Sequence, residues 1–288
     1  MIRSAKRMHK FEIVASDGRI GAIDDFLFDD ERWAIRYVVV DTGRWLPGRQ
    51  VLISPLAVSR THWNEQRLDL SLSRDEVKHS PGIDVHQPVS RRREQEYFDY
   101  YGYPYYWGQA ALWGAHALPM MPTPEELAQR RLKAAEAERK AADEGDAHLR
   151  SVAAVAGYGI RASDGDLGHV EDVLFDDLSW AVRYLVVDTS NWWFGKHVLV
   201  APQWISEISW PDRSVSVSVT RQLLRSAPPY DRAQHVDRQW ELEYYRHLRQ
   251  PGYWLTGDEA RAIREAQSYL SEEPEPHQPG LERRSRPR

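Results

Sequence analysis

The chain has 288 residues, 42% of them hydrophobic and 28% charged, which is enough for about two domains with their own cores. The net charge of −5 argues against a general nucleic-acid binder. The absence of cysteine excludes disulfides, thiolate metal sites and thiol catalysis. No window approaches about 18 apolar residues, and Met1 to Lys10 contain no apolar run. We therefore expect neither a membrane-spanning helix nor a secretory signal.

The first third of the chain predicts a small all-β unit. Short runs rich in β-branched and aromatic residues alternate with turn signals such as Ser16-Asp17-Gly18. The run Trp33–Asp41 is continuously apolar apart from Arg36, which predicts a strand buried on both faces. Ser73 followed by Glu76 predicts a capped helical turn. The six expected strands are 11–14, 20–28, 33–41, 50–53, 57–63 and 68–73.

The middle of the chain has a different composition. Residues 97–107 are crowded with Tyr, Pro and Gly. They either dock on the other β unit, which is the favoured expectation, or recruit a partner. Residues 110–121 are mildly apolar but too short to span a bilayer. Thr123-Pro124-Glu125-Glu126 is a strong helix start, so residues 127–142 are predicted to form a linker helix.

The second half repeats the first at a shift of about 147 residues without a gap, and about 30 of 74 aligned positions are identical. Trp33-Ala34-Ile35-Arg36-Tyr37 matches Trp180-Ala181-Val182-Arg183-Tyr184, and Ala15-Ser16-Asp17-Gly18 matches Ala162-Ser163-Asp164-Gly165. Beyond the second copy, residues 258–270 are expected to be helical and residues 271–288 disordered.

These observations predict a mainly β fold. We expect two tandem small β-barrels that pack as a pseudo-two-fold pair, with a linker helix and a C-terminal helix. The expected parts are repeat 1 (5–90), a Tyr-rich segment and helical linker (91–150), repeat 2 (151–236), a C-terminal helical segment (237–270) and the tail (271–288).

The ordered series in each copy resembles the PRC-barrel family. It consists of Ser-Asp-Gly, the glycines Gly21 and Gly168, the Trp-Ala-Ile/Val-Arg-Tyr strand and a proline after the next strand. The resemblance covers roughly residues 5–85 and 152–232. The family includes the cytoplasmic barrel of the photosynthetic reaction centre H subunit and the C-terminal barrel of a ribosome maturation factor. It implies a scaffold for protein contacts with no shared catalytic residues.

Candidate chemistry is sparse. Two acidic sets could offer oxygen ligands to Ca²⁺ or Mg²⁺, but Asp24 and Asp25 must point to opposite faces of a strand, which favours a structural role. The 11 histidines show no metal-binding spacing, and no nucleophile elbow or phosphate-binding loop is present. We therefore expect no catalytic residues, metal or cofactor. The acidic sets are Asp24, Asp25, Asp29, Asp30 and Glu171, Asp172, Asp176, Asp177.

Six residues are candidates for contact with a partner. Arg36 and Arg183 either bind an anion or pair across the barrel–barrel interface, or have a structural role in which each stacks on an aromatic ring or pairs with Asp41 or Asp188. The structural role is favoured. The loop aromatics either mark an interface or fold back onto the barrel. The loop candidates are Trp45, Trp192, Trp193 and Phe194.

The preferred hypothesis is a non-enzymatic bacterial cytoplasmic scaffold that binds another protein, with homodimerisation as a further option and no direct contact with nucleic acid. The alternatives are a membrane-peripheral subunit of a photosynthetic or electron-transfer complex, with residues 110–121 at the interface, a ligand- or ion-binding sensor, and a ribosome-related role.

Overall fold

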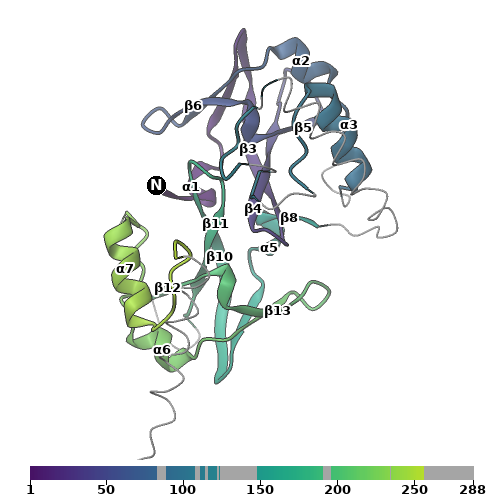
Figure 1. Cartoon of the computed structure of the whole chain (residues 1–288). Helices are drawn as coiled ribbons and strands as arrows, with labels where there is room; N and C mark the ends of the chain where they lie inside the picture. The colour runs from purple at the N-terminus through teal and green to yellow at the C-terminus, as the bar shows by residue number, and fades with distance from the viewer. Residues whose placement is uncertain are drawn as a thin grey trace, which may run out of the picture. The chain divides into compact units, whose positions relative to one another are not determined.

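The computed structural model describes residues 1–82, 89–107, 111–113, 116–121, 123, 148–190, 196–233 and 235–255. The chain divides into a compact unit, Met1–Asp237, and a second unit that begins at Arg238. The first unit contains both copies of the repeat (Figure 1). The expected helices at 127–142 and 258–270 and the expected disordered tail lie outside the described residues.

Each copy forms a sheet of six strands of its own. The order is β5-β4-β3-β2-β7-β6 in the first copy and β12-β11-β10-β9-β14-β13 in the second. Neighbouring strands are antiparallel, except that β2 pairs with β7, and β9 with β14, in parallel. The strands are β2 (Glu12–Ala15), β3 (Gly18–Asp29), β4 (Ala34–Asp41), β5 (Gln50–Ile53), β6 (Val58–His62), β7 (Arg67–Leu70), β9 (Gly159–Ala162), β10 (Gly165–Asp176), β11 (Val182–Asp188), β12 (His197–Val200), β13 (Ile205–Ser209) and β14 (Ser214–Val217).

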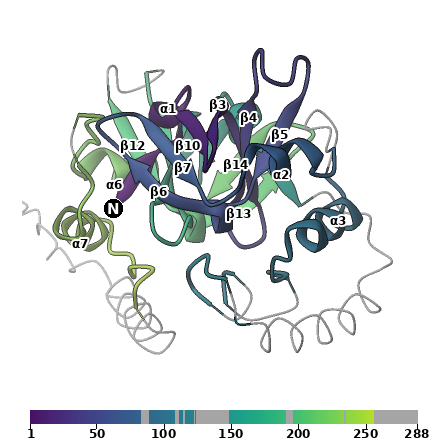
Figure 2. The same cartoon turned by 90° about the horizontal axis from the view of Figure 1, so that it is seen from above.

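The seventh strand of each sheet comes from the other copy. β1 (Ile2–Ser4) pairs with β10, while β8 (Leu149–Ser151) pairs with β3. Each of these strands leads into a one-turn helix, α1 (Ala5–Met8) or α5 (Val152–Val155). Helix α1 contacts β10 and β3, as the view from above shows (Figure 2). The two copies thus exchange their leading segments reciprocally.

The expectation of closed barrels is not confirmed. Strands β5 and β6 lie at opposite ends of the first strand order, β12 and β13 at opposite ends of the second, and no pairing between described strands joins them. The connections contain the 3₁₀ turns η1 (Pro55–Ala57) and η2 (Pro202–Trp204). Because proline carries no backbone N–H and a 3₁₀ turn redirects the chain, these turns do not extend the ladder.

The predicted buried strand is confirmed, since Ala34 to Val40 of β4 are all buried. Helices α2 (Arg74–His79) and α3 (Arg91–Tyr101) lie on one flank of the first sheet (Figure 2). Tyr37 of β4 meets Tyr97 of α3 at 5.3 Å between ring centroids. The Tyr-rich segment therefore docks on its own copy, not on the other copy as expected. The predicted Ser73–Glu76 capping box at the start of α2 is present.

The second copy carries the matching short helix α6 (Arg221–Ser226), which Thr220 caps. In the C-terminal unit, α7 (Arg238–His247) packs against its own following residues. Tyr245 lies edge-on to Trp254 at 5.0 Å, and the Tyr253 hydroxyl donates to Glu241 at 3.0 Å.

Candidate functional site

Half-buried carboxylates hold the exchanged segments in place. Asp25 accepts hydrogen bonds from the Ser151 hydroxyl and the backbone N–H of Ala153. Asp172 accepts the equivalent bonds from Ser4 and Lys6. Burial raises the pKa of both carboxyls, although these hydrogen bonds oppose the shift. Each carboxylate therefore anchors the leading segment of the other copy.

The next acidic pair anchors the same segments from the side. Arg150 donates to Asp30 at 2.7 Å, and its guanidinium lies 4.2 Å above the Trp210 ring. Arg3 makes the equivalent contacts with Asp177 at 2.9 Å and with the Trp63 ring at 3.8 Å. A guanidinium that stacks on an aromatic face while it pairs with a carboxylate has a fixed position.

The two copies also meet at a backbone contact. Ala34 and Ala181, which are counterparts in the duplication, form an antiparallel bridge. The Ile35 N–H donates to the Trp180 carbonyl at 2.8 Å, and the Val182 N–H donates to the Trp33 carbonyl at 2.7 Å. Every contact in this set is repeated with the copies exchanged, as in an isologous two-fold interface.

The acidic sets therefore hold the fold together. Asp24 faces Lys10 and Gln50, whereas Asp25 faces the segment at Ser151, so the two carboxylates diverge as expected. In the tight turn that follows, Asp29 accepts backbone N–H bonds from Glu31 and Arg32. Asp176 does the same for Leu178 and Ser179 in the second copy.

Arg36 belongs to a buried network. It is fully buried, pairs with Asp29 at 3.0 Å and donates to the Leu112 carbonyl at 2.6 Å. Its guanidinium lies 3.7 Å from the centre of the Tyr106 ring. The stacking expected of this residue is present, but its carboxylate partner is Asp29 instead of Asp41. Because Arg36 is enclosed by its own chain, it is not available to a partner, which corrects its place among the contact candidates.

The network continues to a fully buried glutamate. Glu94 accepts hydrogen bonds from the hydroxyls of Tyr37 and Tyr106 at 3.0 and 2.6 Å. It also pairs with Arg91 at 3.0 Å and with His148 at 2.9 Å. Burial alone would lower the pKa of His148, but the hydrogen bond to Glu94 and its charge raise it.

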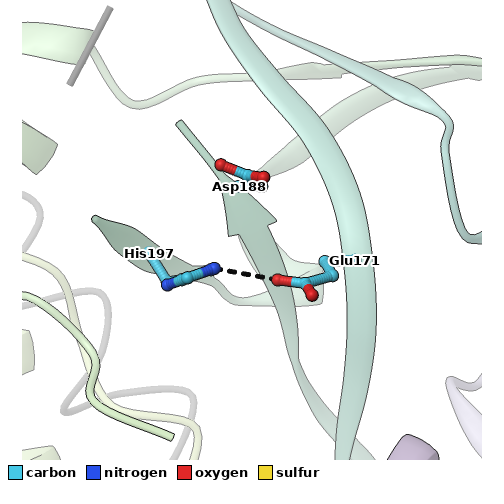
Figure 3. A group of neighbouring side chains, drawn as sticks. All are labelled: Glu171, Asp188 and His197. Atoms are coloured by element: carbon cyan, nitrogen blue, oxygen red, sulfur yellow. Dashed lines mark ion pairs between the residues drawn. The ribbon is translucent and has the colours of Figure 1, made fainter. Parts of the chain in front are cut away.

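A second cluster lies at one edge of the second copy (Figure 3). Glu171 of β10, Asp188 at the end of β11 and His197 at the start of β12 place their ligand atoms within 4.8 Å of one another. Their side chains are 17%, 26% and 19% exposed. His197 Nε2 lies 2.8 Å from Glu171 Oε2. The sequence offers one signal for this cluster, because His197 stands where the first copy has Gln50.

Basic side chains already occupy this cluster. Arg232 contacts the same Glu171 oxygen and lies 2.8 Å from His197 Nε2, while Lys6 donates to Glu171 at 3.1 Å. Burial would raise the pKa of Glu171, but Lys6 and Arg232 hold it below its usual range. A divalent cation would have to displace this guanidinium.

The first copy shows what the cluster does. Its counterparts of Glu171 and His197 are Asp24 and Gln50, and the Gln50 amide donates to Asp24 at 2.8 Å. Lys10 pairs with the same carboxylate at 3.3 Å. A donor at the start of β5 or β12 and a carboxylate on the long strand thus recur with a glutamine in place of His197, which identifies a brace between strands.

Of the remaining contact candidates, two lie within the described residues and three lie outside them. Trp45 is half-buried, with the Arg74 guanidinium 5.1 Å from its ring centre. Arg183 is half-buried and contacts the Ser179 hydroxyl at 3.5 Å. Trp192, Trp193 and Phe194 lie outside the described residues.

The structure reveals a surface that sequence reasoning missed, where exposed apolar side chains border a cavity that Arg60 and Asp177 also line. We call it the apolar surface after those exposed side chains. Leu178, Met120 and Leu118 are 67%, 54% and 40% exposed and line one cavity of about 380 Å³. Trp63 and Trp180, one from each copy, also line it. One signal was available, because Leu178 replaces the Glu31 of the equivalent turn.

One described residue of the segment 110–121 lies at the junction of the copies. Trp113 is buried, and its indole N–H donates to the Ser179 carbonyl at 2.7 Å. No helix of the described part of the chain is long and apolar enough to cross a bilayer. Neither a scan of protein-family models nor a search of curated proteins found a match to this chain.

Proposed function

We propose that this chain is a non-enzymatic scaffold in which two PRC-barrel-like units, fused by duplication, hold a partner protein in the bacterial cytoplasm. The observation that carries the proposal is the apolar surface around Leu178. It brings together β6 and η1 of the first copy, the turn after β10 of the second copy and residues 118–120. The surface exists only where the two copies are paired.

The surface has the character of a contact site. Exposed apolar side chains gathered around a cavity are uncommon on monomeric proteins and mark binding surfaces. Trp63 and Trp180 line the cavity, and tryptophan contributes strongly to binding energy. The occupant we propose is an apolar side chain of another protein, inserted into this cavity beside the two tryptophans.

The duplication supplies the test. Leu178→Glu introduces the residue that the first copy carries in the same Asp-capped turn, so the fold is expected to tolerate it. Glu31→Gln, in the equivalent turn, is the matched control. The tagged proteins are purified from native cells after mild crosslinking, and soluble and membrane fractions are analysed separately by mass spectrometry.

We expect a partner protein to co-purify in stoichiometric amount with the wild type and with Glu31→Gln. The same partner should be lost with Leu178→Glu. Recovery of the same protein with Leu178→Glu would exclude this surface. Recovery of the wild type alone would count against the scaffold. If the partner is lost when Trp193 and Phe194 are changed to Ser but is retained by Leu178→Glu, the contact belongs to the loop that contains Trp193 and Phe194.

A further inference from the structure

A second cavity, of about 270 Å³, lies where the N-terminal segment crosses from the first copy to the second. Its apolar lining includes Phe11 and Trp63 of the first copy and Leu174 of the second. Its polar lining includes Arg7, Tyr230 and His235. It is concave and is lined by apolar and polar side chains together, so it could hold a molecule that has both an apolar body and a polar group.

The charge of the lining is one-sided. The described residues around this cavity include Arg3, Arg7 and His235 and no carboxylate, although the chain carries a net charge of −5. Arg3 is committed to Asp177 and to the face of Trp63. Arg7 donates to the Arg232 carbonyl at 3.3 Å and has no carboxylate partner within the described part of the chain. Its charge is therefore available to an anion.

Tyr230 adds a neutral donor beside this charge. The residue is 8% exposed, and its backbone N–H donates to the His197 carbonyl at 2.9 Å, which fixes its position. Burial and the charge of Asp172, which lies outside the cavity lining, raise the pKa of its hydroxyl, whereas Arg7 and Arg232 oppose the shift. The hydroxyl thus stays protonated at neutral pH and can donate a hydrogen bond.

Comparison of the two copies shows which arginine beside the cavity the fold needs and which it does not. Arg3 has a counterpart in Arg150, with the same carboxylate and tryptophan contacts. Arg7 corresponds to Ala154, which occupies the same place in α5. A one-turn helix at this position therefore does not need an arginine.

We propose that this cavity binds a small organic carboxylate with an aromatic or aliphatic body. The carboxylate would pair with Arg7 and accept a hydrogen bond from Tyr230, while the body would lie against Phe11, Trp63 and Leu174. A charge-assisted pair with arginine favours a carboxylate over its neutral amide. This inference does not rest on the scaffold proposal, although Trp63 lines both cavities.

The test is isothermal titration calorimetry on the full chain. The probes are indole-3-acetate, hexanoate, the neutral indole-3-acetamide and inorganic phosphate. Arg7→Ala introduces the residue of the second copy. Arg19→Ala is the charge-matched control, because Arg19 is 66% exposed and pairs with Glu12 in β2.

We expect at least one of the two carboxylates to bind the wild type and Arg19→Ala equally. The affinity of Arg7→Ala for that carboxylate should be about tenfold or more lower than that of the wild type. If indole-3-acetate binds, the wild type should bind indole-3-acetamide about tenfold or more weaker than indole-3-acetate. Phosphate should not compete, since it has no apolar body. The proposal fails if both carboxylates show no heat at millimolar concentration, if Arg7→Ala binds as the wild type does, or if phosphate displaces them.

Discussion

Two glycines in the long strands, Gly21 and Gly168, allow the neighbouring strand to approach closely, which their spacing in the sequence does not indicate. Gly21 and Gly168 follow the turn glycines by three residues, which by itself indicates only a turn. In the structure a Cβ at Gly21 would lie 2.1 Å from the Asp41 carbonyl oxygen, and one at Gly168 would lie 1.9 Å from that of Asp188. The close approach of β4 to β3, and of β11 to β10, requires glycine here.

We therefore expect Gly21→Ala and Gly168→Ala each to lower the free energy of unfolding by about 3 kcal/mol or more, because a backbone oxygen cannot move aside. Urea denaturation measures this. Gly159→Ala in β9 is the control, since a Cβ there meets nothing within 4 Å. A loss at Gly21 no larger than at Gly159 would contradict the close approach.

The buried pair of His148 and Glu94 predicts a pH dependence. The pKa of His148 is raised in the folded state, so its stabilisation is fully present below the unfolded value, near 6.5, and is lost as pH rises through the folded value. We expect His148→Gln to cost on the order of 1–2 kcal/mol at about pH 5.5 and less at about pH 8.5.

Chemical denaturation of the two proteins across this pH range measures the difference. The double variant with Glu94→Gln serves as the control, because without the carboxylate the histidine loses the partner that raises its pKa. An equal cost of His148→Gln at both pH values would show that folding does not shift the pKa of His148.

At the scale of elements, the sequence predicts the six strands of each copy, but it predicts neither β1 and β8 nor their partners. Alternation and turn chemistry place the strands of both copies to within a few residues. Ile2-Arg3-Ser4 and Leu149-Arg150-Ser151, however, are nearly the same sequence. Either segment fits the edge of either sheet, so a local pattern cannot distinguish pairing within a copy from exchange between copies.

For the same reason, the sequence pattern alone could not predict what the acidic sets bind. Asp25 and Asp172 look like surface carboxylates until the exchanged segment supplies Ser151 and Ser4 as donors. The brace of Glu171 and His197 was equally hidden, because it joins strands that are 26 residues apart in the sequence. Contacts of this kind depend on tertiary pairing, which periodicity does not encode.

The exchange predicts a specific coupling. Ser4 caps α1 and also donates to Asp172, so Ser4→Ala is expected to cost about 1–2 kcal/mol. Ser4→Ala and Asp172→Ala should be non-additive by about 0.5 kcal/mol or more, whereas Ser4→Ala and Asp25→Ala should add. If the leading segments instead paired within their own copies, Ser4→Ala would be coupled to Asp25→Ala and would be additive with Asp172→Ala. The free energies of unfolding of the single and double variants, from thermal or urea unfolding, distinguish the two arrangements.

At the scale of the whole molecule, the two copies are held by more than the chain that joins them. Two exchanged strands, two stacked arginine–carboxylate pairs and the backbone contact at Ala34 and Ala181 all cross between them. Each sheet also presents the edge of its long strand to the leading segment of the other copy. An exposed edge of this kind favours pairing with another chain, so the copies are expected to stay together without a covalent link.

A protease site inserted between residues 124 and 147 tests this expectation on the folded protein. After cleavage the two fragments should co-elute as one particle on size exclusion and separate only in denaturant. The same cleaved protein with Asp25→Ala and Asp172→Ala should dissociate more readily, because both anchors of the exchanged segments are gone. Fragments that separate without denaturant would show that the linker alone holds the copies together, and the apolar surface at Leu178, which needs both copies, would then be lost on cleavage.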